Sequence, residues 1–204
     1  MAENSSNVNG KAYAINVVTP IKPWTTLLQK LVFWYVGVRP STAERLVKLS
    51  FIHFARWVIV SKHQFPHLGE GQPKEELEYD YLLFNSNFNG TWSQYIDAFS
   101  DVLPSGLNLI WNWSVKFPGS RPGTSFKKYI RHNQIDTEYY YVAYPGATIN
   151  DVKSARLVSD AVTALAERAD KCSPEEFERH YTSMLLKVQK NLGQTGAGPV
   201  PASD

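Results

Sequence analysis

The sequence is poor in cysteine: Cys172 is the only one among its 204 residues. A single thiol cannot form an internal disulfide, so we expect a reduced thiol in a cytoplasmic protein. The longest apolar run, residues 31–38, is far shorter than the roughly 20 residues that cross a bilayer. Residues 1–20 have neither the basic start nor the apolar run of a secretory signal, and we interpret them as a flexible N-terminal tail.

Net charge is also scarce. The chain has 21 Lys and Arg against 19 Asp and Glu, and the resulting formal charge of +2 argues against a nucleic-acid-binding polycation. A basic run over residues 116–131 is interleaved with aromatic residues, which is typical of single-stranded nucleic-acid sites. The acidic residues of segment 70–80 can neutralise this run, so we predict no nucleic-acid partner.

Signatures of metal sites and of common enzymes are missing as well. His63 and His67 are the only close histidine pair, and Pro66 between them disfavours the helix that would present both to one ion. We therefore predict no metal site. The usual nucleophile, phosphate-loop and dinucleotide-binding motifs do not occur in the sequence.

Aromatic residues, in contrast, are abundant: 6 Trp, 11 Tyr and 10 Phe make up 13% of the chain. Apolar spacing and cap residues predict helices over residues 25–36, 41–50 and 125–132, and further helices that begin at Thr91, Thr148 and Ser173. Apolar runs and alternation predict strands over residues 51–60, 79–88, 107–115 and 138–144. We expect the apolar stripes of the first helix and of the helix after Thr148 to face the core, and strand 51–60 to be buried on both faces.

These elements predict an α+β fold in which a four-stranded sheet packs against helices, with additional helices at the N- and C-terminal ends. We place a single domain at residues 21–192 and a disordered C-terminal tail at residues 193–204. The strand–helix–strand unit over residues 79–114 is expected to make two strands parallel through a right-handed crossover, and the first two strands are expected to be antiparallel.

Polar residues occur inside the apolar strands, and these are the first candidates for function. Burying a charge or an amide without a partner costs roughly 1 to 3 kcal/mol, so such groups are exposed, paired, or directed into a polar pocket. An ion pair of Arg56 with Asp80 or Glu138, with the asparagines exposed at an edge, is the structural alternative to a pocket. For the pocket we predict these ligand-binding residues: Arg56, Asn85, Asn87, Trp111, Asn112, His132 and Tyr140.

A resemblance to known proteins is carried by five segments of the sequence: HFARWVIV, YDYLLFNSNFNGTWSQYIDAF, GLNLIWNWSVKFPG, YIRHNQ and EYYYVAYPGAT. They resemble a set of uncharacterised bacterial proteins with strands of the form HFARF-V and LLF-SNF-G-W--Y--F, a family without an established activity. The strand pattern is also similar to ferredoxin-like, dimeric α+β barrel proteins, which include small monooxygenases and haem enzymes such as the dye-decolorising peroxidases. The resemblance implies a ferredoxin-like sheet, but no residue here matches a haem-ligand motif.

Three functions follow as hypotheses. The first is the binding of a small apolar or aromatic molecule, at a homodimer interface where a partner's sheet covers the open sheet face. The second is an oxidoreductase on the same scaffold, without cofactor or with haem, in which His53 or His132 is the catalytic base or ligand. The third is a peripheral membrane or protein-interaction module that acts through the helix at residues 24–38; its few basic residues, Lys22 and Lys30, favour core packing instead, so membrane association is not expected.

Overall fold

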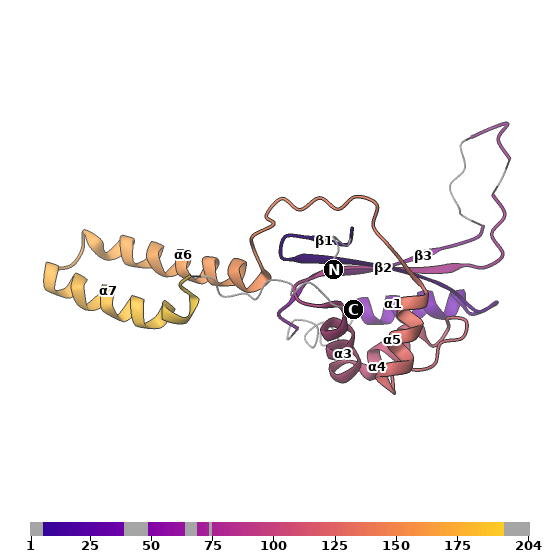
Figure 1. The fold of residues 1–204 in the computed structure, drawn as a ribbon. Helices are drawn as coiled ribbons and strands as arrows, with labels where there is room; N and C mark the ends of the chain where they lie inside the picture. Colours follow the sequence, from indigo (N-terminus) through magenta and orange to yellow (C-terminus); the bar gives the residue numbers. More distant parts are fainter. Residues whose placement is uncertain (1–5, 39–48, 64–68, 74, 194–204) are drawn as a thin grey trace.

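The structure is a computed structural model that describes residues 6–38, 49–63, 69–73 and 75–193 (Figure 1). It is an α+β fold with a five-stranded antiparallel sheet. The strands are β1 (Val8–Asn9), β2 (Ala12–Pro20), β3 (Ile52–Val60), β4 (Tyr81–Phe88) and β5 (Gln134–Ile135). The described helices are α1 (Thr26–Val38), α3 (Trp92–Val102), α4 (Pro104–Trp111), α5 (Gly123–His132), α6 (Ile149–Ala169) and α7 (Pro174–Val188), followed by a 3-10 turn at Gln189–Asn191.

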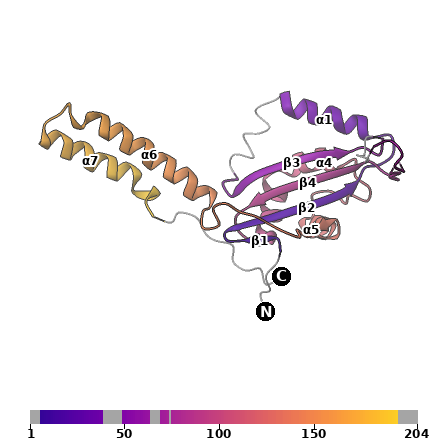
Figure 2. The same cartoon turned by 90° about the horizontal axis from the view of Figure 1, so that it is seen from above.

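The sheet has the order β1-β2-β4-β3 (Figure 2). Strand β5 pairs with β2 on the same edge as β1. Every pair is antiparallel, so the predicted parallel crossover over residues 79–114 is wrong. The antiparallel pairing of β3 with β4 is confirmed, and it places Trp57 opposite Phe84. The segment between them contains no helix or strand in its described residues.

Strand β2 lies in the segment that we interpreted as an N-terminal tail, and that interpretation is wrong. The strand pairs with β1, β4 and β5, and the side chains of Ile15 and Val17 are completely buried. Its core-facing residues alternate along the strand, as a strand with one face against the core requires. Of the predicted tails, residues 1–5 and 194–204 lie outside the described part of the chain.

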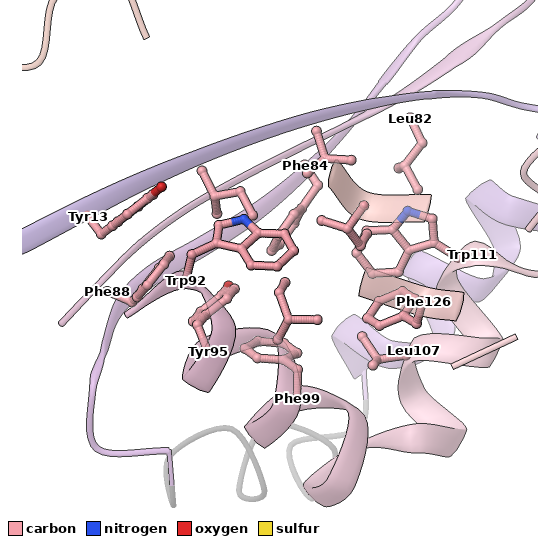
Figure 3. Close-up of a cluster of buried hydrophobic side chains, with 14 of the residues drawn as sticks. Tyr13, Leu82, Phe84, Phe88, Trp92, Tyr95, Phe99, Leu107, Trp111 and Phe126 are labelled. Atoms are coloured by element: carbon pink, nitrogen blue, oxygen red, sulfur yellow. The ribbon is translucent and has the colours of Figure 1, made fainter. Parts of the chain in front are cut away.

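One face of the sheet forms the core with α3, α4 and α5, and this core contains much of the aromatic surplus (Figure 3). The rings of Phe88 and Tyr95 stack with centroids 3.8 Å apart, and Trp111 meets Phe84 edge to face at 5.3 Å. Pairs of this geometry stabilise a core by about 0.5–1.5 kcal/mol beyond the burial of their area. The core is therefore built from interlocking rings that join the helices to β4.

Two of the predicted strands are wrong. Residues 107–115 alternate in sequence, but the chain forms α4, whose first helical position is Pro104 and whose buried residues, Leu107 and Trp111, are one turn apart. Residues 138–144 form neither helix nor strand, and Tyr139 and Tyr141 are 83% and 73% exposed. Strand β3 exists as predicted but is not buried on both faces, because it is the edge strand and Phe54 and Val58 are exposed.

The helices with clear start signals are confirmed. Thr91, Thr148 and Ser173 each cap a helix with a reciprocal capping box. The helix predicted at residues 125–132 is α5, whereas the one predicted at residues 41–50 lies outside the described residues except at its end.

Helices α6 and α7 pack on each other and extend away from the sheet (Figures 1 and 2). The inward stripe predicted for α6 is therefore largely wrong: Val152 and Val162 are exposed, and only Ser154 and Leu165 are buried. No helix among the described residues is long and apolar enough to cross a membrane.

A candidate ligand site beneath a strap

A segment without regular structure, residues 136–147, crosses the sheet face opposite the helices; we call it the strap (Figure 1). Asparagine side chains of the N-terminal strands and of β4 bind it. Asn9 Nδ2 donates to the carbonyl of Tyr140 at 2.7 Å, and Asn16 Nδ2 donates to Thr137 Oγ1 at 2.9 Å. Asn87 Nδ2 donates to the hydroxyl of Tyr140. The strap is therefore held through hydrogen bonds that link residues far apart in the sequence.

The turn between β1 and β2 touches the strap closely at Gly10. The backbone N–H of Lys11 donates to the carbonyl of Pro145 at 2.8 Å. A Cβ atom on Gly10 would lie 2.1 Å from that same oxygen, and Gly10 has a φ of 60°. Only glycine fits both the left-handed backbone and the short distance to the strap.

Between the strap and the sheet lies an open cavity of about 260 Å³. Its sheet side is formed by Ala12, His53, Phe54 and Asn87, its strap side by residues 140–144 and Ala147, and one further residue, Val152, comes from α6. No Asp, Glu, Lys or Arg side chain is among the lining residues. The size is just below the roughly 300–1,000 Å³ of drug-sized ligand sites, and the lining suits an uncharged molecule of one or two rings.

The hydroxyl of Tyr140 supplies a hydrogen-bond donor to this cavity. Burial disfavours the phenolate and raises the pKa of Tyr140, and the hydrogen bond with Asn87 opposes the shift without cancelling it. Because the hydroxyl oxygen accepts its bond from Asn87, the phenolic proton can be donated elsewhere. A carbonyl or hydroxyl oxygen of a ligand is a suitable acceptor.

His53 lies on the sheet side of the same cavity. Partial burial lowers its pKa, and a hydrogen bond with Asn89 opposes that shift. The lowered pKa favours the neutral imidazole, and because one of its nitrogens is engaged with Asn89, the other is available to a ligand. Asn89 is itself fixed, since its Nδ2 donates to Lys11 O at 2.6 Å and its Oδ1 accepts from Ile149 N at 3.1 Å.

The predicted site residues divide between the two faces of the sheet. His53, Asn87 and Tyr140 come together at the cavity. Trp111 is buried in the core on the other face. Asn112 and His132 are exposed at the ends of α4 and α5, so the structure brings none of these three to the cavity.

Arg56 and Asn85 lie opposite each other on β3 and β4 but do not line the cavity. Asn85 Nδ2 donates to Asn16 Oδ1 at 2.7 Å, so the nitrogen of this amide is paired within the sheet. The alternative ion pair of Arg56 with Asp80 or Glu138 does not form among the described residues. Asp80 instead accepts hydrogen bonds from Thr26 Oγ1 and from the backbone N–H of Lys62.

Several cavity residues were not among the predicted ones, chiefly Phe54, Tyr141, Tyr144 and Val152. The repeated tyrosines of residues 138–144 were a usable signal, but we assigned them to a strand. Asn9 and Asn16, which bind the strap together with Asn87, are missing from the prediction because they belong to the segment interpreted as a tail.

Neither candidate histidine is placed to bind haem. His132 is exposed at the end of α5, and the cavity beside His53 is smaller than a porphyrin requires. Among the described residues, no three His, Cys, Asp or Glu side chains gather as metal ligands.

Comparison of the chain with protein-family models, with curated proteins and with solved structures gives no match.

Proposed function

We propose that this chain is a small-molecule-binding α+β domain that holds an uncharged aromatic ligand between the strap and the sheet. The observation that carries the proposal is the cavity of about 260 Å³, which is lined by aromatic and aliphatic side chains and by the polar side chains of His53 and Asn87. Phe54 and the strap tyrosines provide surface for stacking against a ring. Tyr140 and His53 provide hydrogen bonds that orient it.

The absence of charged side chains from the lining gives the proposal its specificity. A carboxylate bound in this cavity would lose its hydration and would find no cationic side chain among the lining residues. A carboxamide of the same shape is uncharged and would form hydrogen bonds with the neutral side chains of Tyr140 and His53. Benzamide and benzoate are a matched pair for this comparison. From its size, benzamide is expected to bind with a Kd of about 1–10 mM, and benzoate more weakly.

The test uses NMR titration of the full chain with both compounds. Tyr140→Phe removes one hydrogen-bond donor and should weaken benzamide binding about three- to tenfold. Tyr139→Phe is the matched control, because Tyr139 is the neighbouring residue and lies outside the cavity lining. Equal effects of the two variants, or stronger binding of benzoate than of benzamide, would contradict the proposal.

A second comparison uses strand β3. Phe54 lines the cavity and is 49% exposed, whereas Val58, four residues further along the same face of the strand, is 41% exposed and lies outside the lining. Phe54→Ala should reduce benzamide binding, and Val58→Ala should leave it unchanged. This site needs no second copy of the chain, because the strap covers this part of the sheet.

We also propose that the sheet is ferredoxin-like. The order of these elements along the chain is β2, α1, β3, β4, the helices α3 to α5, and β5. The order of the strands across the sheet is β5-β2-β4-β3. This succession of elements supports the β-α-β-β-α-β class, to which β1 and the α6–α7 hairpin are additions. A crystal structure in which β5 does not pair with β2 would contradict it.

A further inference from the structure

A second cavity lies at the end of the sheet where β2 ends and β4 begins, and it shares no lining residue with the candidate ligand site beneath the strap. Its volume is about 390 Å³, which is within the roughly 300–1,000 Å³ of small-molecule sites. The residues at the start of α1, after β3 and before β4 surround it. We call it the end cavity, and its lining includes Trp24, Leu27, Lys62, Glu78, Tyr79 and Asp80.

Asp80 joins the three segments around the end cavity. Its Oδ1 accepts a hydrogen bond from the backbone N–H of Lys62 at 2.7 Å, and its Oδ2 accepts one from Thr26 of α1. Its backbone carbonyl accepts a hydrogen bond from the N–H of Ile21, also at 2.7 Å. Both oxygens of this carboxylate are therefore used to hold the walls of the cavity together.

One wall of the end cavity is apolar and exposed. The prediction that the apolar stripe of α1 packs in the core is wrong, because Leu27, Leu31 and Trp34 are 68%, 52% and 67% exposed. At the cavity this stripe is represented by Leu27 and by Trp24, which is 98% exposed. An indole ring without cover is available to a ligand for stacking or for contact with a cation.

The backbone of Trp24 is strained. Its φ is 69°, in the left-handed region that large side chains disfavour. Such a conformation persists where the surrounding structure imposes it, and residues of this kind cluster at ligand-binding sites. Here hydrogen bonds fix the chain on both sides: the N–H of Lys22 donates to the carbonyl of Trp113 at 2.7 Å, and the N–H of Thr25 donates to the carbonyl of Lys22 at 3.2 Å. The indole is thereby held beside the cavity against its own backbone preference.

Four Lys, Asp and Glu side chains line the end cavity, two of each sign. Two of them are engaged in the fold, because Lys22 Nζ donates to the carbonyl of Asn112 at 2.9 Å and Asp80 accepts the bonds described above. Lys62 and Glu78 are the other two, and neither forms an ion pair with a side chain in the described part of the chain. The cavity therefore offers one ammonium group and one carboxylate to a ligand.

The carboxylate of Glu78 is positioned by its neighbour in the sequence. It accepts a hydrogen bond from the hydroxyl of Tyr79, and this bond, together with the charge of Glu78, raises the pKa of Tyr79. The phenol consequently stays protonated at pH 7 and adds no charge to the cavity. His63 also lines the cavity and is exposed.

The two available charges and the apolar wall together select a class of ligand. An anion alone would bring its charge close to Glu78, and a cation alone would bring its charge close to Lys62. We propose that the end cavity binds a zwitterionic amino acid with an apolar side chain. Glu78 accepts hydrogen bonds from the ammonium group, Lys62 donates to the carboxylate, and the side chain lies against Trp24 and Leu27.

The experiment is NMR titration of the ¹⁵N-labelled full chain with three compounds that share a phenyl ring. L-Phenylalanine carries both charges, phenethylamine lacks the carboxylate, and 3-phenylpropionate lacks the ammonium group. From its size, L-phenylalanine is expected to bind with a Kd of about 1–10 mM. Each of the other two compounds should bind at least about threefold more weakly, because one charge-assisted hydrogen bond is lost.

Two charge variants test the two ends of the ligand separately. Lys62→Met should weaken the binding of L-phenylalanine about three- to tenfold without weakening that of phenethylamine. Glu78→Gln should weaken it by a similar factor without weakening that of 3-phenylpropionate. Lys30→Met and Glu75→Gln are the matched controls, because both residues are exposed and lie outside the lining. Thermal melts verify that all four variants are folded.

A third variant tests the apolar wall. Trp24→Ala should weaken the binding of L-phenylalanine, whereas Trp34→Ala, at an exposed position outside the lining, should leave it unchanged. The shifts caused by L-phenylalanine should centre on the amides of Lys62, Glu78 and Tyr79. No saturable shift at these amides, shifts centred on the strap, equal affinity of the three compounds, or equal effects of the variants and their controls would overturn the proposal.

Discussion

Asn87 on β4 donates a hydrogen bond from its side-chain amide to the hydroxyl of Tyr140 on the strap. The two residues are 53 positions apart, and both line the same cavity. This hydrogen bond joins the sheet to the strap and leaves the phenolic proton of Tyr140 to be donated into the cavity between them. Asn87, a polar residue in an apolar strand, is thus both a hydrogen-bond partner of the strap and part of the candidate ligand site.

Replacing Asn87 should loosen the strap. Asn87→Ala leaves the Tyr140 hydroxyl without its donor and should lower the free energy of unfolding by about 0.5–1.5 kcal/mol. Hydrogen–deuterium exchange should accelerate in residues 136–147 more than in the core helices. Asn112→Ala, at an exposed position remote from the strap, is the control and should change neither quantity. Unchanged exchange in the strap of Asn87→Ala would show that the bond does not hold it.

The close approach at Gly10 gives a steric test. Gly10→Ala places a Cβ atom 2.1 Å from Pro145 O at a φ of 60°, so either the turn or the strap must move. We expect a loss of about 1–3 kcal/mol in the free energy of unfolding and weaker benzamide binding. Gly146→Ala is the matched control on the strap, because no atom lies within 4 Å of its added Cβ. Denaturant unfolding of both variants makes the comparison, and equal stability of the two would contradict this contact.

His53 predicts a pH dependence of stability. Its pKa is lowered in the folded protein, so the unfolded chain takes up the proton first as the pH falls below the ordinary value of 6.5. The wild type should therefore lose stability relative to His53→Gln between pH 7.5 and pH 5. Thermal melts across this range test it, with His132→Gln on the other side of the sheet as the control. A constant difference between wild type and His53→Gln would contradict the assignment.

Asp80 predicts a second loss of stability in acid, in a lower pH range and from a carboxyl group. Burial raises its pKa, but hydrogen bonds from Thr26, from the Lys62 backbone and from Ser61 outweigh burial and lower it below 3.8. The carboxylate therefore stabilises the fold above pH 3.8, and this contribution is lost as the pH falls below that value.

Asp80→Asn should lower the free energy of unfolding at pH 7 by about 1 kcal/mol, and the difference from the wild type should shrink in acid. Glu78→Gln, two residues earlier and exposed, is the control. Urea unfolding at pH 7 and pH 3.5 measures both variants. A difference for Asp80→Asn that does not change with pH would contradict the role of the carboxylate.

The elements that were predicted correctly are those with local causes. Thr91, Thr148 and Ser173 each start a helix because the cap and its partner are three residues apart, a relationship that the sequence itself contains. Strands β3 and β4 are recognisable as apolar runs between turns. None of these features depends on distant parts of the chain.

The elements that were predicted wrongly depend on distant partners. Asn9 of β1 and Asn16 of β2 lie in the segment interpreted as a tail, because the strap that they bind is more than 120 residues away in the sequence. The alternation over residues 107–115 also fits a helix with Leu107 and Trp111 one turn apart, and only the core decides between the two. The tyrosines of residues 138–144 were assigned to a strand, but Tyr140, Tyr141 and Tyr144 line a cavity instead.

Some residues of the candidate site could be predicted from the sequence, but the way they come together could not, because it depends on contacts between distant parts of the chain. Asn87 was identified from the cost of burying an amide, and Tyr140 from its place among aromatic residues. Their meeting requires the strap to cross the sheet, which no local pattern encodes. Trp111 and Asn112 were grouped with them because residues 107–115 were assigned to the same sheet, and α4 places both elsewhere.

The most direct test of the ligand site is chemical-shift mapping of the ¹⁵N-labelled chain during titration with benzamide. The account predicts the largest shifts at the backbone amides of His53, Phe54, Asn87 and residues 140–144, with little change at Leu107, Trp111 and α1. Shifts centred on α4 or on α1, or no saturable shift around the strap, would contradict a ligand site between the strap and the sheet.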